Sequence, residues 1–254
     1  MKRLLILSVC LGCYSSASDS IHLLEKNEWE VGMVRPIRYG LGRGREISAY
    51  KLLSLKMPNI TYTKLRWRKF DWNIATQHSL YYPTPLLQWF QSPLGMDIGE
   101  PNMFSLISPE FDIPQMVSFW NTISVTKEIM EDVHFTGSVT LGVAAGARGL
   151  AKQSTIDLPY IYPRLAVYYS DAVIKMRTAA HSKISKQWGY TVSGDMFLMP
   201  GATGDFAVEH SIQLEWNKHS GFSLLAGYKM IYGEYPFGTQ AHIFPAFDMV
   251  WRSE

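Results

Sequence analysis

Cysteine is almost absent from this sequence, and its only two copies, Cys10 and Cys13, lie near the N-terminus. If the chain is cleaved after Ala17, no cysteine remains, which excludes a disulfide framework and a cysteine-ligated metal site. The rest of the chain also lacks an uncharged apolar run of about 18 residues, which excludes a helical membrane protein. A basic excess is missing too: without Lys2 and Arg3, 22 residues of each charge remain, which argues against a nucleic-acid partner.

Residues 1–17 have the layout of a secretory signal peptide. Two basic residues precede the apolar run 4–11, which is too short to cross a bilayer, and small residues follow. A lipidated N-terminus is the competing interpretation, because Cys13 follows Leu-Gly. However, Cys10 stands three residues earlier, where a lipoprotein signal normally has leucine. We therefore expect cleavage after position 17 and a single domain over residues 18–254.

Alternation of apolar and polar residues dominates the remaining sequence. Along residues 205–217, Leu214 and Trp216 belong to a mostly apolar face, and Glu215 belongs to the polar face. This period of two is typical of a half-buried β-strand. We predict twelve strands, roughly at residues 28–36, 45–55, 58–68, 71–82, 115–127, 132–147, 159–169, 172–183, 186–199, 205–217, 220–232 and 240–252.

The length of these strands favours a membrane-spanning barrel over a soluble β-sandwich. They run to about 9–16 residues, whereas soluble strands average about 5–6 and a tilted membrane-crossing strand needs about 9–11. Short turns make successive strands antiparallel neighbours. We therefore expect an all-β fold, a closed antiparallel transmembrane β-barrel of about 12 strands, within a range of roughly 10–14. A secreted all-β protein whose aromatic residues fill a core is the alternative.

The tryptophans support the same fold class. Most of the eight lie near the ends of predicted strands, as expected of aromatic girdles at the two membrane interfaces. The predicted interface residues are Trp29, Trp67, Trp72, Trp188, Trp216 and Trp251.

The last predicted strand adds a resemblance. Ile243, Phe247, Met249 and Trp251 share one face, and in this the C-terminus resembles the β-signal of Gram-negative outer-membrane barrels. It departs from that pattern because three residues, 252–254, follow the final aromatic. The resemblance is to the class of outer-membrane β-barrel proteins and not to one family. It implies location in the bacterial outer membrane, with outer-membrane lipid and the barrel assembly machinery as partners.

Residues 83–114 interrupt the alternation. Their six prolines argue against a central strand, because proline lacks the N–H that a strand ladder needs. Apolar residues such as Trp89 and Phe90 distinguish the segment from a plain linker. Counted from a periplasmic N-terminus, this connection falls on the periplasmic side, where turns are normally short. Either a strand is missing from the count, or the segment plugs the lumen or covers a mouth, which we favour; an ordinary surface loop is the third interpretation.

If the apolar faces contact lipid, the charged residues of the opposite faces line the lumen. Lys or Arg facing lipid near the bilayer midplane costs roughly 2–4 kcal/mol, which supports this assignment. The charges either pair across a mostly occluded lumen, which we favour, or line a pore that selects solutes. The predicted lumen-lining residues are Arg164, Lys175, Arg177, Asp195, Glu209, Glu215, Lys229, His242 and Asp248, with Lys64, Arg66 and Arg68 added to them.

Specific catalytic motifs are lacking: the sequence has no phosphate-binding loop, zinc-protease motif or hydrolase elbow. Outer-membrane lipid hydrolases carry His-x-Ser on one strand, but each His–Ser pair here is adjacent and would point to opposite faces. His134 and Thr136 share a face, with threonine in place of serine. We therefore expect no catalytic residue, metal ion or cofactor. A narrow or gated channel for small solutes is the leading hypothesis, an interaction barrel with an occluded lumen the alternative, and a lipid-modifying enzyme the third.

Overall fold

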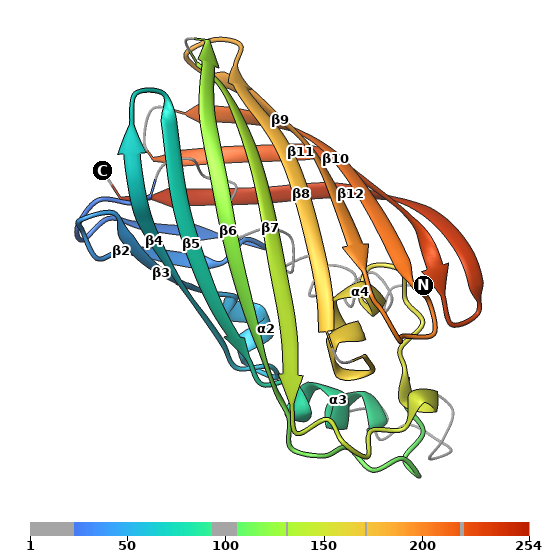
Figure 1. Ribbon diagram of the computed structural model, residues 1–254. Helices are drawn as coiled ribbons and strands as arrows, with labels where there is room; N and C mark the ends of the chain where they lie inside the picture. The colour runs from blue at the N-terminus through green and yellow to red at the C-terminus, as the bar shows by residue number, and fades with distance from the viewer. Residues whose placement is uncertain (1–22, 93–105, 131, 171, 219–220, 254) are drawn as a thin grey trace.

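The computed structural model of this chain describes residues 23–92, 106–130, 132–170, 172–218 and 221–253. Its twelve strands form one closed antiparallel barrel, in which each strand pairs with the next along the chain and β12 pairs with β1 (Figure 1). The predicted fold class is confirmed. The expected signal peptide, together with Cys13, lies outside the described residues.

Strands β1 to β3 are short, with four or five residues, whereas β4 to β12 have at least ten. Between the strands lie the helices α2 (Lys51–Ser54), α3 (Thr84–Gln91) and α4 (Tyr162–Leu165), and the 3-10 turns η1 (Lys152–Ser154) and η2 (Ala166–Tyr168). No helix in the described part of the chain is long and apolar enough to cross a bilayer. The strands are β1 Trp29–Gly32, β2 Ile37–Gly40, β3 Arg45–Ala49, β4 Asn59–Lys69, β5 Trp72–Tyr81, β6 Val117–Met130, β7 Val133–Ala145, β8 Ala172–Lys183, β9 Trp188–Leu198, β10 Phe206–Lys218, β11 Phe222–Tyr235 and β12 Gly238–Arg252.

The strand number agrees, but two predicted elements are wrong, and a third, the strand predicted at 45–55, ends at Ala49 and is followed by α2. The predicted strand 28–36 ends at Gly32, and β2, which the sequence did not reveal, follows after a turn. The predicted strand 159–169 is instead α4 and η2, and its residues from Tyr162 to Tyr168 are all buried. A wall strand must expose alternate residues to lipid, so a segment buried on every side cannot belong to the wall.

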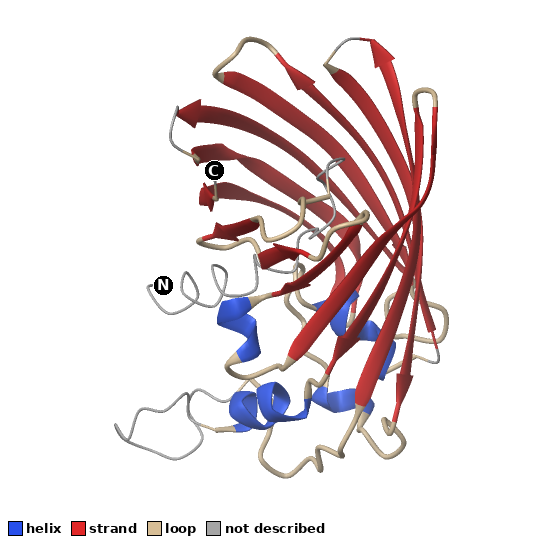
Figure 2. Cartoon of the chain, turned by 90° about the vertical axis from the view of Figure 1, so that its left-hand side faces the viewer, coloured by secondary structure: helices blue, strands red, loops and turns tan. Residues whose placement is uncertain are grey.

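The first of these errors, the missed strand β2, changed the expected side of the long connection after residue 82. The start of β1, the end of β12 and five connections, beginning with that from β2 to β3, lie at one end of the barrel, which we call the termini end. The long connections from β5 to β6 and from β7 to β8 lie at the opposite end, the loop end, together with α2, α3 and α4 (Figures 1 and 2). Because β1 and β2 are both strands of the wall, β5 ends and β6 begins at the loop end, where long loops are usual, and not at the termini end.

The two faces of the strands differ as a membrane-spanning barrel requires. On β10, Leu214 is 47% exposed on the outer face, whereas Glu209 is 1% exposed on the inner face. Apolar residues such as Ile123, Val139 and Phe247 continue the outer face on other strands, and each is at least half exposed. An apolar outer band around a polar interior is the surface of an outer-membrane-type barrel.

The six predicted interface tryptophans all lie at the termini end. Trp29, Trp72 and Trp188 begin strands there, and Trp67, Trp216 and Trp251 end strands there. The expectation of girdles at both interfaces is therefore wrong for these residues, since all of them belong to one girdle. The missed strand β2 explains the error, because it shifts Trp67 and Trp72 from one end of the barrel to the other.

An apolar core fills the loop end of the barrel, and we call it the cap. It consists of residues 50–58, α3, 106–116 and 156–168, packed against the inner faces of the wall. Leu87 and Phe90 of α3 and Tyr162 of α4 are almost completely buried in it. Residues far apart in the sequence thus build one hydrophobic unit at this mouth. The described part of the segment 83–114 contributes to this unit through α3.

Candidate functional site in the barrel lumen

A cluster of buried ion pairs lies directly beneath the cap. The carboxylate of Glu209 on β10 accepts hydrogen bonds from both terminal nitrogens of Arg164, one of them at 2.7 Å. Lys229 Nζ on β11 donates to the same carboxylate at 2.9 Å. Glu209 thereby ties α4, which belongs to the cap, to two strands of the wall.

A second carboxylate extends this cluster along the wall. Asp195 on β9 lies 2.9 Å from Lys175 Nζ and 2.7 Å from Arg177 Nη1, both on β8. The Arg164 guanidinium packs on the Tyr160 ring, with 4.0 Å between its central carbon and the ring centroid, and on Phe197 at 5.1 Å. Charge-assisted bonds of this kind are strong where water is excluded, and losing one partner leaves an uncompensated buried charge.

Hydrogen bonds within the connection from β7 to β8, and from the cap to the wall and to the connection from β9 to β10, reinforce this attachment. Tyr162 Oη accepts from the Gly204 backbone N–H at 2.9 Å, and Tyr235 Oη donates to the Pro159 carbonyl at 3.1 Å. Tyr169 Oη donates to the Ser154 carbonyl at 3.0 Å, and burial raises the pKa of this hydroxyl to about 12. Asp157 accepts a hydrogen bond from Gln240 at 3.0 Å, while burial raises the pKa of its carboxyl. The cap is therefore held by specific polar bonds as well as by apolar packing.

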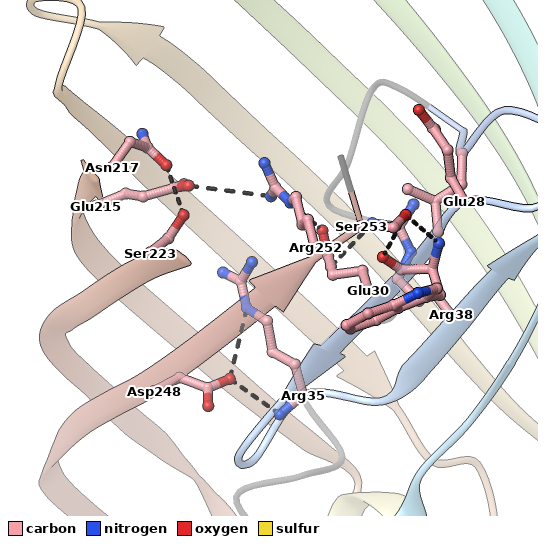
Figure 3. A network of polar contacts seen from close by, with 12 residues as sticks. Glu28, Glu30, Arg35, Arg38, Glu215, Asn217, Ser223, Asp248, Arg252 and Ser253 are labelled. Atoms are coloured by element: carbon pink, nitrogen blue, oxygen red, sulfur yellow. Dashed lines mark hydrogen bonds and ion pairs between the residues drawn. The ribbon is translucent and has the colours of Figure 1, made fainter. Parts of the chain in front are cut away.

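A separate polar network closes the barrel at the termini end (Figure 3). Arg38 on β2 donates to Glu46 on β3 at 2.8 and 2.7 Å and to Glu30 on β1 at 3.1 Å. Arg252 on β12 also donates to Glu30, and its Nη2 lies 4.0 Å from Glu215. Strands β1 and β12 share only the short register from Glu30↔Arg252 to Gly32↔Val250, so this network supports the closing seam.

The turn between β1 and β2 is fixed to the same seam by Asp248. The backbone N–H groups of Val34 and Arg35 donate to its two carboxylate oxygens, each at 2.9 Å. The Arg35 side chain then extends across the lumen and donates to Gln213 on β10 at 3.1 Å. Figure 3 shows Arg35 and Arg252 pointing toward the β10 residue Glu215.

Hydroxyl groups line the opposite part of the lumen, along β4 to β7. Thr61 pairs with Ser79 at 2.9 Å, Thr122 with Thr140 at 2.8 Å, and Thr126 with Thr136 at 2.9 Å, each across neighbouring strands. His134, on the inner face with Thr136, stacks on His181 of β8 with 6.5 Å between the ring centroids. The residues described contain no group of three or more His, Cys, Asp or Glu side chains placed to hold a metal ion.

The predicted lumen residues lie on different kinds of structural element. Lys175, Arg177, Asp195, Glu209, Glu215, Lys229 and Asp248 lie on inner faces of wall strands, as the alternation indicated. Arg164 also points into the lumen, but from α4 and not from a strand. His242 lies near the loop end, where its ring stacks on Phe244 and Nε2 lies 3.2 Å from Gln240 Oε1.

Two of the added cations do not face the lumen. Lys64 lies opposite Thr76 in the β4–β5 ladder, and Arg66 Nε donates to the Thr76 hydroxyl at 2.8 Å. Thr76 lies on the outer face of β5, because the inner face carries Ser79, which is buried against Thr61. Lys64 and Arg66 therefore point outward, which corrects the expectation. Arg68, beyond the register shift between Leu65 and Trp67, contacts Asn73 at 2.9 Å near the rim.

Sequence reasoning missed the network at the seam. Glu30 fell in a predicted strand without being chosen, and Arg38 and Glu46 flank a turn. The spacing of eight residues reflects the three short strands β1 to β3: Glu30 lies directly opposite Arg38, and Glu46 lies diagonally across the next ladder, opposite Gly40. The available signal was one charged residue on the inner face of each of these strands.

Comparisons with known proteins give a likeness of fold. No protein-family model matches the chain, and no curated protein matches it. Among solved structures, the outer membrane channel DcaP of Acinetobacter baumannii matches with a TM-score of 0.41 and 7% identity, over 85% of this chain and 61% of that one. Outer-membrane expressed OmpT of Vibrio cholerae matches with a TM-score of 0.46 and 8% identity, over 88% of this chain and 63% of that one. The chain thus spans about three fifths of these outer-membrane proteins, and the likeness concerns the barrel fold alone.

Proposed function

We propose that this protein is a narrow, gated outer-membrane channel for small solutes, with the cap as its gate. The observation that carries the proposal is the attachment of the cap to the wall through Arg164 and Glu209. The apolar core of the cap closes one mouth. By the usual arrangement of short periplasmic turns and long external loops, this mouth faces the outside of the cell.

The interior below the cap supports a path for solutes. The side chains of Arg252 and Arg35 toward the termini end are 42% and 24% exposed, whereas that of Glu209 beneath the cap is 0% exposed. Arg252 and Arg35 are therefore more accessible to water than Glu209, whereas Glu30 and Arg38 at the seam are buried. Charged groups on one part of the wall and hydroxyl groups on β4 to β7 would suit small polar solutes, since both can replace their hydration.

The buried ion pairs give the gate a physical basis. A buried pair stabilises one arrangement only while both partners are present, because the desolvation of each ion is offset by the other. If the cap moves, Arg164 leaves Glu209, and both groups gain water in its place. The closed state is thus held by an interaction that a hydrated opening can replace.

Single-channel conductance in planar bilayers tests the proposal. We expect rare, small openings for the unmodified protein and more frequent openings for Glu209→Gln, which removes the charge that holds Arg164. Glu215→Gln, at the wetter end, is the matched control and should leave the open probability unchanged. If neither protein conducts, the barrel is an occluded interaction module, the alternative that the complete burial of Tyr162 and Phe90 in the cap favours. Turnover of phospholipid by the purified protein would instead indicate an enzyme.

A further inference from the structure

Three cations face outward from β3 and β4. Arg45 lies directly opposite Lys64 in the β3–β4 ladder, and Arg66 follows two residues later on β4. Among the described residues, none of the three takes part in an ion pair. Like charges directly opposite each other destabilise a strand pair. An anion between Arg45 and Lys64 would offset this repulsion.

The register places all three groups on the membrane side of the wall. Glu46 and Thr63, the next pair along the ladder, are buried on the inner face, so Arg45 and Lys64 lie on the outer face. Arg66 Nε donates to Thr76 Oγ1, which also faces outward. The Thr76 hydroxyl keeps its own hydrogen for a further acceptor. The four residues form one outward-facing group, which we call the basic patch.

The basic patch lies beside the tryptophan girdle. Trp67 directly follows Arg66 in the sequence, and Trp72 begins β5, the strand that carries Thr76. Tryptophan side chains of this kind lie at the level of the lipid headgroups. Long Lys and Arg side chains close to that level extend their charges into the headgroup layer while their stems remain among the acyl chains. The charges can therefore meet the phosphate layer of the membrane.

We propose that Arg45, Lys64, Arg66 and Thr76 bind the phosphate of an anionic membrane lipid at the termini end. One phosphate between Arg45 and Lys64 offsets their mutual repulsion, and its oxygens match the donors of two guanidinium groups and one ammonium group. A second copy related by a twofold axis does not fit this surface, because it would present the same three cations. The carboxylate of Glu46, the residue after Arg45, lies on the inner face. The site is independent of the gate.

The test compares unfolding by urea in two kinds of vesicle. The mature chain and Lys64→Gln are refolded into phosphatidylcholine vesicles and into vesicles that also contain phosphatidylglycerol. In phosphatidylcholine alone, Lys64→Gln should raise the urea midpoint, because it relieves the repulsion with Arg45. With phosphatidylglycerol present, the same change should lower the midpoint, because it removes a phosphate ligand. Lys64→Arg should behave as the unmodified protein in both. A shift of the same sign in both vesicles overturns the proposal.

Two further arms identify the source of the phosphate. Lys186→Gln removes an exposed cation from the turn between β8 and β9. Its shift of the urea midpoint should have the same sign in both kinds of vesicle. A reversal as large as that of Lys64→Gln would mean that any surface cation is attracted to the anionic membrane. Inorganic phosphate added to phosphatidylcholine vesicles should not reproduce the effect of phosphatidylglycerol. If it does, the patch binds free phosphate and the lipid site is rejected. Direct contact is measured by quenching of tryptophan fluorescence with brominated phosphatidylglycerol, which should be weaker for Lys64→Gln.

Discussion

The Glu209 carboxylate, on a wall strand, holds the guanidinium of Arg164, which lies 45 residues earlier in the sequence on a helix inside the lumen. This pair joins the apolar cap to the polar lumen. Both side chains are almost completely shielded from water. The gate that we propose depends on this contact more than on any other between the cap and the wall.

Replacing Glu209 with glutamine should destabilise the closed barrel strongly. The change leaves Arg164 and Lys229 without the carboxylate between them, and breaking such a buried pair typically costs about 3–5 kcal/mol. Glu215→Gln removes a carboxylate that lies 4.0 Å from a half-exposed arginine, so its effect should be below about 1 kcal/mol. Urea titration of both variants in lipid vesicles measures the difference. Equal effects would mean that the cluster beneath the cap is hydrated.

The assignment of faces on β10 predicts that Leu214→Arg impairs insertion. Leu214 faces lipid, and an arginine there costs roughly 2–4 kcal/mol near the midplane of the bilayer. Leu214→Met keeps an apolar side chain of similar volume and should refold as the unmodified protein does. Folding yield into vesicles, read from the faster migration of the unheated barrel in a detergent gel, reports the result. Normal refolding of the arginine variant would show that the faces are reversed.

The packing of α3 in the cap predicts that substituting two neighbouring aromatic residues will destabilise the protein to different extents. Phe90 is completely buried, so Phe90→Ala should cost about 3–5 kcal/mol through lost burial and the cavity left behind. Trp89 lies on the partly exposed side of α3, and Trp89→Ala should have a smaller effect. Protease digestion of the refolded barrel should release the connection after β5 much faster for Phe90→Ala. Equal digestion of both variants would place α3 outside the cap core.

Asp157 should make the cap more stable in acid than at neutral pH. Burial raises the pKa of its carboxyl above the ordinary value, so folding favours the protonated form. The corresponding stability is fully present below the ordinary pKa of 3.8 and is lost as the pH rises through the raised value. Asp157→Asn should remove this dependence and slow hydrogen exchange in residues 150–168 at neutral pH.

The control for the pH experiment is Asp205→Asn, which changes an exposed aspartate in the connection from β9 to β10. It should leave the exchange of the cap unchanged at every pH. The prediction would be contradicted if hydrogen exchange in the cap had the same pH dependence in the unmodified protein and in Asp157→Asn.

The sequence predicted the wall well where local pattern decides the structure. On β10 the alternation assigned Leu214 and Glu215 to the correct faces, because the side chains of a strand point to opposite sides in turn. The same rule failed at residues 159–169, where apolar residues occupy both the odd-numbered and the even-numbered positions. Such a run fits a strand or a buried helix equally, and only packing against the wall selects α4 and η2. The outward direction of Lys64 depends on pairing with Thr76, which alternation alone did not reveal.

The sequence by itself determined the fold class, because the period of two and the strand length are local properties that hydrogen bonding and bilayer thickness constrain directly. Only the tertiary structure decided which charges meet. Barrel closure brings Glu30 of the first strand to Arg252 of the last, and the fold of the cap brings Arg164 to Glu209. Both contacts join residues from distant parts of the chain, and their geometry depends on strand number and register. A single missed strand, β2, reverses the end of the barrel to which the following residues belong, so no local pattern could place them.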